Sequence, residues 1–336
     1  MARKPTAIYI NQRSQVVNFI TQEMSFLRYF LPLIQRGNEK NISSTMYWLP
    51  CGKYTCPQKN YKSLDDLSKQ FNFNLIQLKK PIKVNGPTFF IEGVGIDLIK
   101  GSKNINMTYM TDYQLLWPKY WNKIDYCIFP NKLFSQKINK QDDPKSLHYG
   151  STKYDLRFDP DKIKNKYGLA KKNALFLYPK LEDKRDIDID EILNTLRKQG
   201  YKVFIKTRGK DPISPKRPPE SPVIHAGDWF PHPSIDLLSA CDLMINFDST
   251  AVKEAAILKT PVINYHVKPE NRGFYGRLNF LLNEKFVFHA NKDSLEKIIK
   301  RVELINFSDH FSSLIKTKFF DRRIVCEKIL STLCAE

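Results

Sequence analysis

The sequence predicts an α/β protein of two domains, each built on a doubly wound parallel sheet. Three observations lead to this prediction. The chain has 336 residues, which is enough for two separate cores. Its content of 42% hydrophobic and 12% aromatic residues is typical of a packed globular protein. Short β-rich runs alternate with amphipathic segments along the chain, as they do in parallel α/β domains.

The first half, residues 1–165, carries seven candidate strands and forms one predicted domain. Apolar side chains recur with a helical period over residues 15–34, so we predict a helix there. The candidate strands are Thr6–Ile10, Thr45–Leu49, Asn74–Leu78, Thr88–Ile91, Met107–Thr111, Tyr126–Pro130 and Ser146–Tyr149.

The second half, residues 166–305, repeats the same alternation and forms the second predicted domain. Its strands are expected at Ala174–Tyr178, Lys202–Ile205, Val223–His225, Leu243–Phe247, Pro261–Tyr265 and Phe286–His289. Helices are expected at Ile189–Lys198, Ser234–Ala240 and Ala251–Leu258. Residues 306–336 read as helices that could pack back on the first domain, with a helix break near Asn306.

The net charge of +19 is the unusual feature of the composition. Such a charge suits nucleic acid, an anionic membrane surface or a polyanionic substrate. However, the lysines are spread along the whole chain, and no nucleic-acid-binding motif accompanies them, so nucleic acid is not the expected partner. The abundance of lysine and asparagine, and with it the positive charge, could equally reflect an AT-rich genome.

Membrane, secretion and metal signals are weak. No run of about eighteen apolar residues occurs, and the N-terminus shows no secretory signal, so we expect a cytoplasmic protein, with peripheral membrane contact left open. Of the six cysteines only Cys51 and Cys56 are close in sequence, and no second Cys/His pair accompanies them. We therefore expect no metal site.

The segment Ile235–Ala255 carries the main functional signal. A short helix leads into an apolar strand, which ends in a polar Asp-Ser-Thr turn before a new helix. Ser249 or Thr250 could cap that helix, where free backbone N–H groups favour an anion. Glu254, one turn further on, could accept hydrogen bonds from ribose hydroxyls. Taken singly, each residue could equally be a cap or a solvated side chain.

This order of residues resembles the donor-binding half of GT-B glycosyltransferases and their relatives, the UDP-N-acetylglucosamine 2-epimerases and the glycerol-phosphate polymerases. The matching positions are Asp236, Asp242, Ser249, Thr250, Glu254 and the strand at 259–263. The resemblance implies two Rossmann-like domains facing across a cleft. It also implies that Ser249 and Thr250 contact the diphosphate of a UDP-, GDP- or CDP-linked sugar and that Glu254 contacts the ribose, with no further cofactor. The turn lacks the glycine found in many relatives.

Two further stretches extend the resemblance. Residues 149–155, Tyr-Gly-Ser-Thr-Lys-Tyr-Asp, are similar to the "G-x-P-K-Y-D" that closes the first domain of epimerases and polymerases, with Thr152 in place of proline. Residues 205–210 follow the second strand of the later sheet, where relatives carry a phosphate-facing basic residue. Lys206 or Arg208 could therefore neutralise the leaving diphosphate, although basic residues are common throughout this chain.

An inverting transfer needs a general base on the acceptor side. Candidates are carboxylates at strand ends of the first domain, namely Glu92 and Asp112, although either could be a cap or a structural acid. No Asp-x-Asp metal motif sits at a strand end, so basic side chains and helix N–H groups would stabilise the leaving group.

We therefore predict a metal-independent glycosyltransferase that acts on the hydroxyl group of a glycan or lipid-linked acceptor, and the positive charge of the chain favours an anionic one. Epimerases carry "H-x-E-A-G-x-R" and "S-G-G-x-Q-E-E", and this chain keeps Glu92 but has Phe90 for the histidine and no matching arginine. A 2-epimerase-like enzyme and a CDP-glycerol-type transferase are alternatives. A third is a non-catalytic basic protein that binds polyanions.

Overall fold

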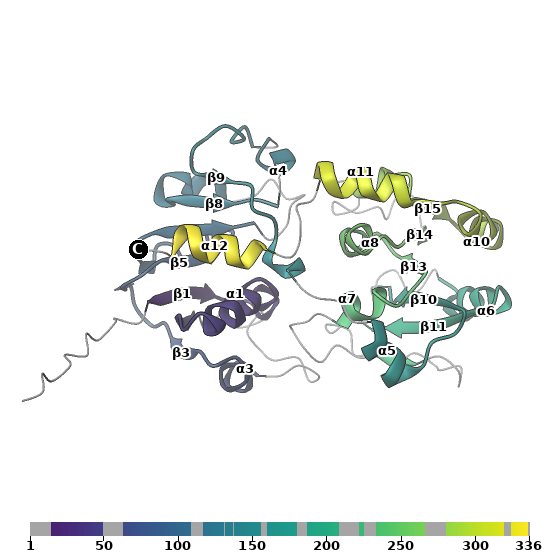
Figure 1. Cartoon of the computed structure of the whole chain (residues 1–336), viewed down its shortest axis with the longest axis horizontal. Coiled ribbons are helices and arrows are strands. Elements are labelled where there is room, and N and C mark those ends of the chain that lie inside the picture. The colour runs from purple at the N-terminus through teal and green to yellow at the C-terminus, as the bar shows by residue number, and fades with distance from the viewer. Residues whose placement is uncertain are drawn as a thin grey trace, which may run out of the picture.

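The computed structural model describes residues 15–49, 63–108, 117–130, 132–136, 138–155, 160–179, 187–207, 222–224, 233–265, 280–318 and 324–334. They form two lobes, each built around a parallel sheet, and the arrows of β1 and β11 point toward the middle of the molecule from opposite sides (Figure 1). The predicted pair of parallel α/β domains is confirmed.

The first sheet has seven strands in the order β3-β2-β1-β5-β7-β8-β9, all parallel. They are β1 (Val16–Thr21), β2 (Ser43–Trp48), β3 (Asn74–Gln77), β5 (Thr88–Ile91), β7 (Asn104–Met107), β8 (Tyr126–Ile128) and β9 (Ser146–Leu147). A separate two-stranded piece pairs β4 (Ile82–Lys83) with β6 (Ile99–Lys100). The helical segments of this half are η1 (Met24–Phe26), α1 (Leu27–Glu39), α3 (Leu64–Phe71), η2 (Trp117–Lys123), α4 (Lys132–Gln136) and η3 (Thr152–Tyr154).

The helix predicted over residues 15–34 is wrong in its first part. Residues Val16–Thr21 form β1, an interior strand between β2 and β5, and the α-helix begins only at Leu27. The predicted strand Met107–Thr111 is shifted as well, because β7 ends at Met107. The strand predicted at Thr6–Ile10 lies outside the described residues.

Neighbouring residues on a strand point to opposite faces of the sheet, so the apolar strands of the first sheet have two faces to bury. Both faces are covered. Phe19 and Phe89 stack on one face, with ring centroids 5.4 Å apart, in a core completed by α1. Ile20 and Phe90 belong to the core on the other face, beneath η2 and α4.

The second sheet has six parallel strands in the order β12-β11-β10-β13-β14-β15. They are β10 (Lys172–Leu177), β11 (Tyr201–Lys206), β12 (Val223–Ile224), β13 (Leu243–Asn246), β14 (Val262–Tyr265) and β15 (Val287–Ala290). The chain order reverses between β10 and β13, so the sheet has a switch point there, where ligands of open α/β sheets bind.

Helices cover both faces of the second sheet. They are α5 (Pro160–Tyr167), α6 (Ile189–Lys198), α7 (Pro233–Leu238), α8 (Val252–Leu258), η6 (Phe280–Asn283), α10 (Leu295–Glu303) and α11 (Ser308–Lys318). Phe204 and Met244 face α7, α8 and α11, whereas Ile205 and Ile245 face α6 and α10. Asp188 starts α6 at the predicted place, since its carboxylate accepts from the Glu191 amide at 3.0 Å.

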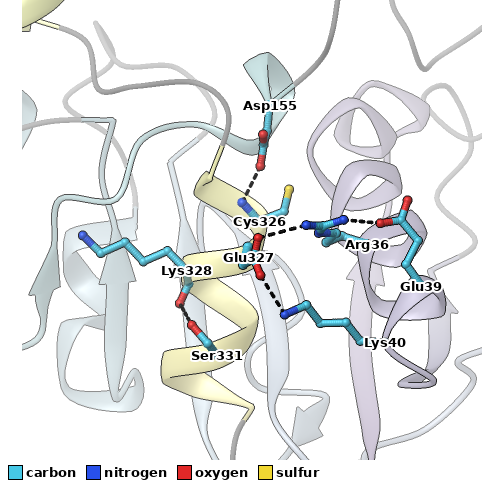
Figure 2. A network of polar contacts seen from close by, with 8 residues as sticks. All are labelled: Arg36, Glu39, Lys40, Asp155, Cys326, Glu327, Lys328 and Ser331. Atoms are coloured by element: carbon cyan, nitrogen blue, oxygen red, sulfur yellow. Dashed lines mark hydrogen bonds and ion pairs between the residues drawn. The ribbon is translucent and has the colours of Figure 1, made fainter.

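The last helix, α12 (Val325–Leu333), returns to the first lobe, while α11 packs on α8 of the second (Figure 1). The buried face of α12 joins the core beside α1 through Val325, Ile329 and Leu330. A polar network borders this contact: Glu327 pairs with Arg36 at 2.9 Å and with Lys40 at 3.0 Å (Figure 2). Within the described part of the chain, no helix is both long and apolar enough to cross a bilayer.

Candidate functional site

The turn after β13 lies at the switch point of the second sheet, and a buried amide network holds it in place. Asn246 ends β13 and pairs with Asn264, the second-last residue of the neighbouring β14, and both are fully buried. Asn246 Nδ2 donates to Asn264 Oδ1 at 2.9 Å, and Asn264 Nδ2 donates to Asp248 Oδ1 at 2.7 Å. Asp248 adopts a left-handed φ of 48°, which asparagine and aspartate tolerate better than most residues. The network therefore fixes a sharp turn at the carboxyl edge of the sheet.

The residues predicted to cap the next helix do not do so. The residue preceding α8 is Ala251, and no side chain caps the helix there. Ser249 Oγ accepts from the Ala251 amide at 3.3 Å, within the turn itself, and Thr250 is exposed. Both residues nevertheless lie at the edge where the diphosphate was predicted to bind.

Glu254 is the buried carboxylate of this region. It lies in the first turn of α8, whose residues 252–257 are all buried, and only 6% of its surface is exposed. Its Oε1 forms an ion pair with Lys153 Nζ of η3. Its Oε2 is buried and has no hydrogen-bond partner among the residues that the structure describes. A buried carboxylate oxygen without a donor is costly, so this atom marks a place where a ligand hydroxyl could bind.

Lys206 is the buried cation of this region. It ends β11, is 4% exposed, and its Nζ donates to the Thr207 carbonyl at 2.5 Å. Burial, and to a smaller extent the positive charge of Arg28, lower the pKa of Lys206 to about 7. Among the described residues no carboxylate pairs with it. A buried lysine in this state would gain from a bound anion.

Arg28 links these groups electrostatically. It lies in α1 of the first lobe, yet its charge lowers the pKa of both Lys206 and Lys153. Burial is the main cause that lowers the pKa of Lys153; Glu254 raises it, and Lys253 adds to the lowering. Arg28 of α1 thus lies within electrostatic range of both η3 and the end of β11, and the ion pair between Lys153 and Glu254 joins η3 to α8.

Glu92, a predicted catalytic base, lies at the carboxyl edge of the first sheet, directly after β5. It adopts a left-handed φ of 53°, and its amide donates to the Met107 carbonyl at 3.2 Å. The next residue, Gly93, has a φ of 69°, and a Cβ there would come within 2.4 Å of the Tyr120 ring. The two other predicted site residues, Asp112 and Arg208, lie outside the described residues.

The sequence did not single out Lys153, Arg28, Asn246 or Asn264 as site residues. Lys153 carried a usable signal, since it is the lysine of the "G-x-P-K-Y-D"-like segment. Arg28 could not be found, because its distance in sequence from Lys153 and Lys206 hides its electrostatic interaction with them in the fold. The described residues contain no group of three His, Cys, Asp or Glu side chains arranged to hold a metal ion.

Comparison with solved structures identifies the fold. The wall teichoic acid polymerase TagF is similar at a TM-score of 0.62 and 14% identity, over 94% of this chain and 87% of that chain. A glycotransferase of kitacinnamycin is similar at 0.60 and 9%, over 96% and 100% of the two chains. A UDP-N-acetylglucosamine 2-epimerase from Listeria monocytogenes is similar at 0.59 and 10%, over 95% of each.

The chain therefore has the two-domain GT-B fold that glycosyltransferases share with these epimerases and with TagF. No protein-family model matches the sequence, and no curated protein is similar to it at the sequence level. At identities this low the likeness defines the fold and leaves the reaction to be argued from the site.

Proposed function

We propose that this protein is a glycosyltransferase that moves a sugar from a nucleotide-diphosphate donor to a hydroxyl acceptor. The donor would bind at the carboxyl edge of the second sheet, around the turn after β13. The observation that carries the proposal is the buried carboxylate oxygen without a hydrogen-bond donor at this edge, together with a buried lysine whose charge no described carboxylate balances. Glu254 Oε2 lacks a donor, and Lys206 has no carboxylate partner in the described part of the chain.

The two groups match the two polar parts of a nucleotide diphosphate. A carboxylate oxygen such as Glu254 Oε2 accepts from ribose hydroxyls, which are donors held at a fixed spacing. The ammonium of Lys206, together with Arg28, would neutralise the diphosphate as it leaves. Arg208, which the sequence predicts to contact the phosphates, would add to this charge. Ser249 and Thr250 would contact the phosphates from the turn. These positive charges are the reason to propose transfer without a metal ion.

The acceptor would approach from the first lobe. Glu92 is the proposed general base, because it follows β5, the middle strand of the first sheet, at the edge that faces the middle of the molecule (Figure 1). Asp112 remains the second candidate from the sequence. The charge of +19 favours an anionic glycan or lipid-linked acceptor, and with it contact with a membrane surface.

Transfer of glycerol phosphate from a CDP-linked donor is a second candidate, since TagF has the same fold. It would use the same diphosphate and ribose contacts. Epimerisation is disfavoured by Phe90, which is buried in the core where the epimerase motif has a histidine.

A thermal-shift screen with UDP, GDP, CDP and their sugar conjugates tests the proposal. At least one nucleotide should raise the melting temperature by several degrees at concentrations well above its Kd. Glu254→Gln should abolish most of that shift, because it removes the charged acceptor but keeps the volume. Glu296→Gln, which changes an exposed carboxylate of α10, is the matched control and should behave as wild type. Absence of any nucleotide shift in the wild type would overturn the proposal.

A further inference from the structure

The segment Thr152–Asp155 is fastened to the first lobe at both of its ends. Thr152 is fully buried, and its Oγ1 donates to the Tyr29 carbonyl of α1 at 2.7 Å. The Asp155 carboxylate accepts from the Cys326 amide at the start of α12 at 2.6 Å (Figure 2). These anchors come from two different helices, so the backbone between them has little freedom.

Lys153 lies between the two anchors, and its side chain reaches the second lobe. Its Nζ pairs with Glu254 Oε1, and the side chains of the pair are only 11% and 6% exposed. Tyr154, over whose ring the Lys153 ammonium lies at 5.1 Å, packs against the core beneath α7 and α8. The ion pair is therefore a buried connection between a fixed segment of one lobe and the proposed donor site of the other.

The two oxygens of Glu254 have different surroundings. Oε1 is held by Lys153, whereas Oε2 is buried and no described residue donates a hydrogen bond to it. An ion-paired lysine fixes the rotamer of a carboxylate, and loss of the cation leaves a buried charge uncompensated. Arg28 and Lys253 are the other cations that act electrostatically on Lys153.

We propose that Lys153 is a positioning residue for the donor: it holds Oε1 of Glu254 so that Oε2 accepts from the ribose hydroxyls. Lys153 itself touches neither the sugar nor the reacting atoms. Because its backbone belongs to the first lobe, the geometry of the ribose contact depends on both lobes. This inference rests on the proposed function, since it names how the ribose half of that site is oriented.

The experiment compares ribose with a sugar that lacks its hydroxyls. The probe is the nucleoside diphosphate that stabilises the wild type most, together with its 2′,3′-dideoxy form, and calorimetry gives both Kd values. The wild type should prefer the ribonucleotide by about tenfold or more, as expected for hydrogen bonds to a charged acceptor. Lys153→Met should lose most of this preference by weakening ribonucleotide binding, with the dideoxy affinity nearly unchanged. Lys153→Arg should restore the preference.

Controls separate the possible outcomes. Lys300→Met removes an exposed ion-paired lysine of α10 and should bind as wild type. Should Lys153→Met fail to fold, Lys153→Gln replaces it, with the same loss expected. The inference is overturned if Glu254→Gln loses the ribose preference while the Lys153 variant keeps it, or if the variant loses affinity for both nucleotides equally. A wild type that binds no nucleotide refutes the proposed function itself.

Discussion

Lys206 shows how a single buried group can set the pH dependence of the site. Its pKa falls to about 7 in the folded chain from an ordinary value of 10.5, and burial is the main cause. The unfolded chain therefore binds more protons than the folded chain between these pH values, so this residue makes stability rise with pH across that window. A bound anion raises the pKa of Lys206 again, because it favours the charged form of the lysine.

Nucleotide binding should accordingly take up a proton at Lys206 above neutral pH. We expect the affinity for the stabilising nucleoside diphosphate to fall between pH 7 and pH 9, by at most about tenfold per pH unit. Lys206→Met should bind more weakly but with a nearly flat profile over the same range. Calorimetric Kd values at four pH values would measure both. Parallel slopes in the two proteins would exclude Lys206 as the titrating group.

At the residue scale, the sequence predicted where the polar turn would lie because its motif is continuous along the chain, while the roles of its residues stay predictions. Glu254 and the Asp248-Ser249-Thr250 turn lie at a sheet edge because the strand, turn and helix are local in sequence. Lys153 belongs to a motif that the sequence shows, but its role could not be predicted. Its pairing with Glu254 depends on how the two lobes meet. Contacts between residues about a hundred positions apart are beyond the reach of local pattern.

At the level of elements, α12 shows which contacts hold a helix in place. Its apolar face is buried beside α1, whereas the network of Arg36, Lys40 and Glu327 is largely exposed (Figure 2). The neighbouring cations lower the pKa of Glu327. Exposed pairs of this kind contribute little, since solvent screens them and ordering long side chains opposes them.

Ile329→Ala should therefore destabilise the first lobe by about 2–5 kcal/mol, the usual cost of truncating a buried isoleucine. Glu327→Ala should cause a much smaller loss. Urea unfolding followed by circular dichroism would compare the two variants with the wild type. A larger loss from Glu327→Ala than from Ile329→Ala would show that the polar network, and not the apolar face, fixes α12.

The element that the sequence misplaced is β1. Val16, Phe19 and Ile20 fit a helical period, but they also fit a strand buried on both faces, which reads as a nearly continuous apolar run. The interior position between β2 and β5 decides in favour of the strand, and it depends on pairing partners remote in sequence. By contrast α6, with Asp188 at its start and a clear period, could be predicted to the residue.

For the whole molecule, the charge of +19 leaves two functional classes to separate. Many of its lysines, such as Lys123, Lys132 and Lys300, lie in exposed pairs with carboxylates, where salt screens their field. The cations at the proposed donor site are different, because Lys153 and Lys206 are buried and are screened less. Ionic strength should therefore affect a surface polyanion and a buried nucleotide to different extents.

Raising the salt from 50 to 200 mM should weaken binding of a long polyanion such as heparin by about a thousandfold, if six or more charges are neutralised on the surface. Nucleoside diphosphate binding should weaken by about tenfold or less, since at most a few charges are neutralised and the site is buried. Kd values for both ligands at the two salt concentrations measure the contrast. A protein stabilised only by heparin, in a steeply salt-dependent way, and by no nucleotide at either concentration would be a polyanion-binding protein with the GT-B fold and not a transferase.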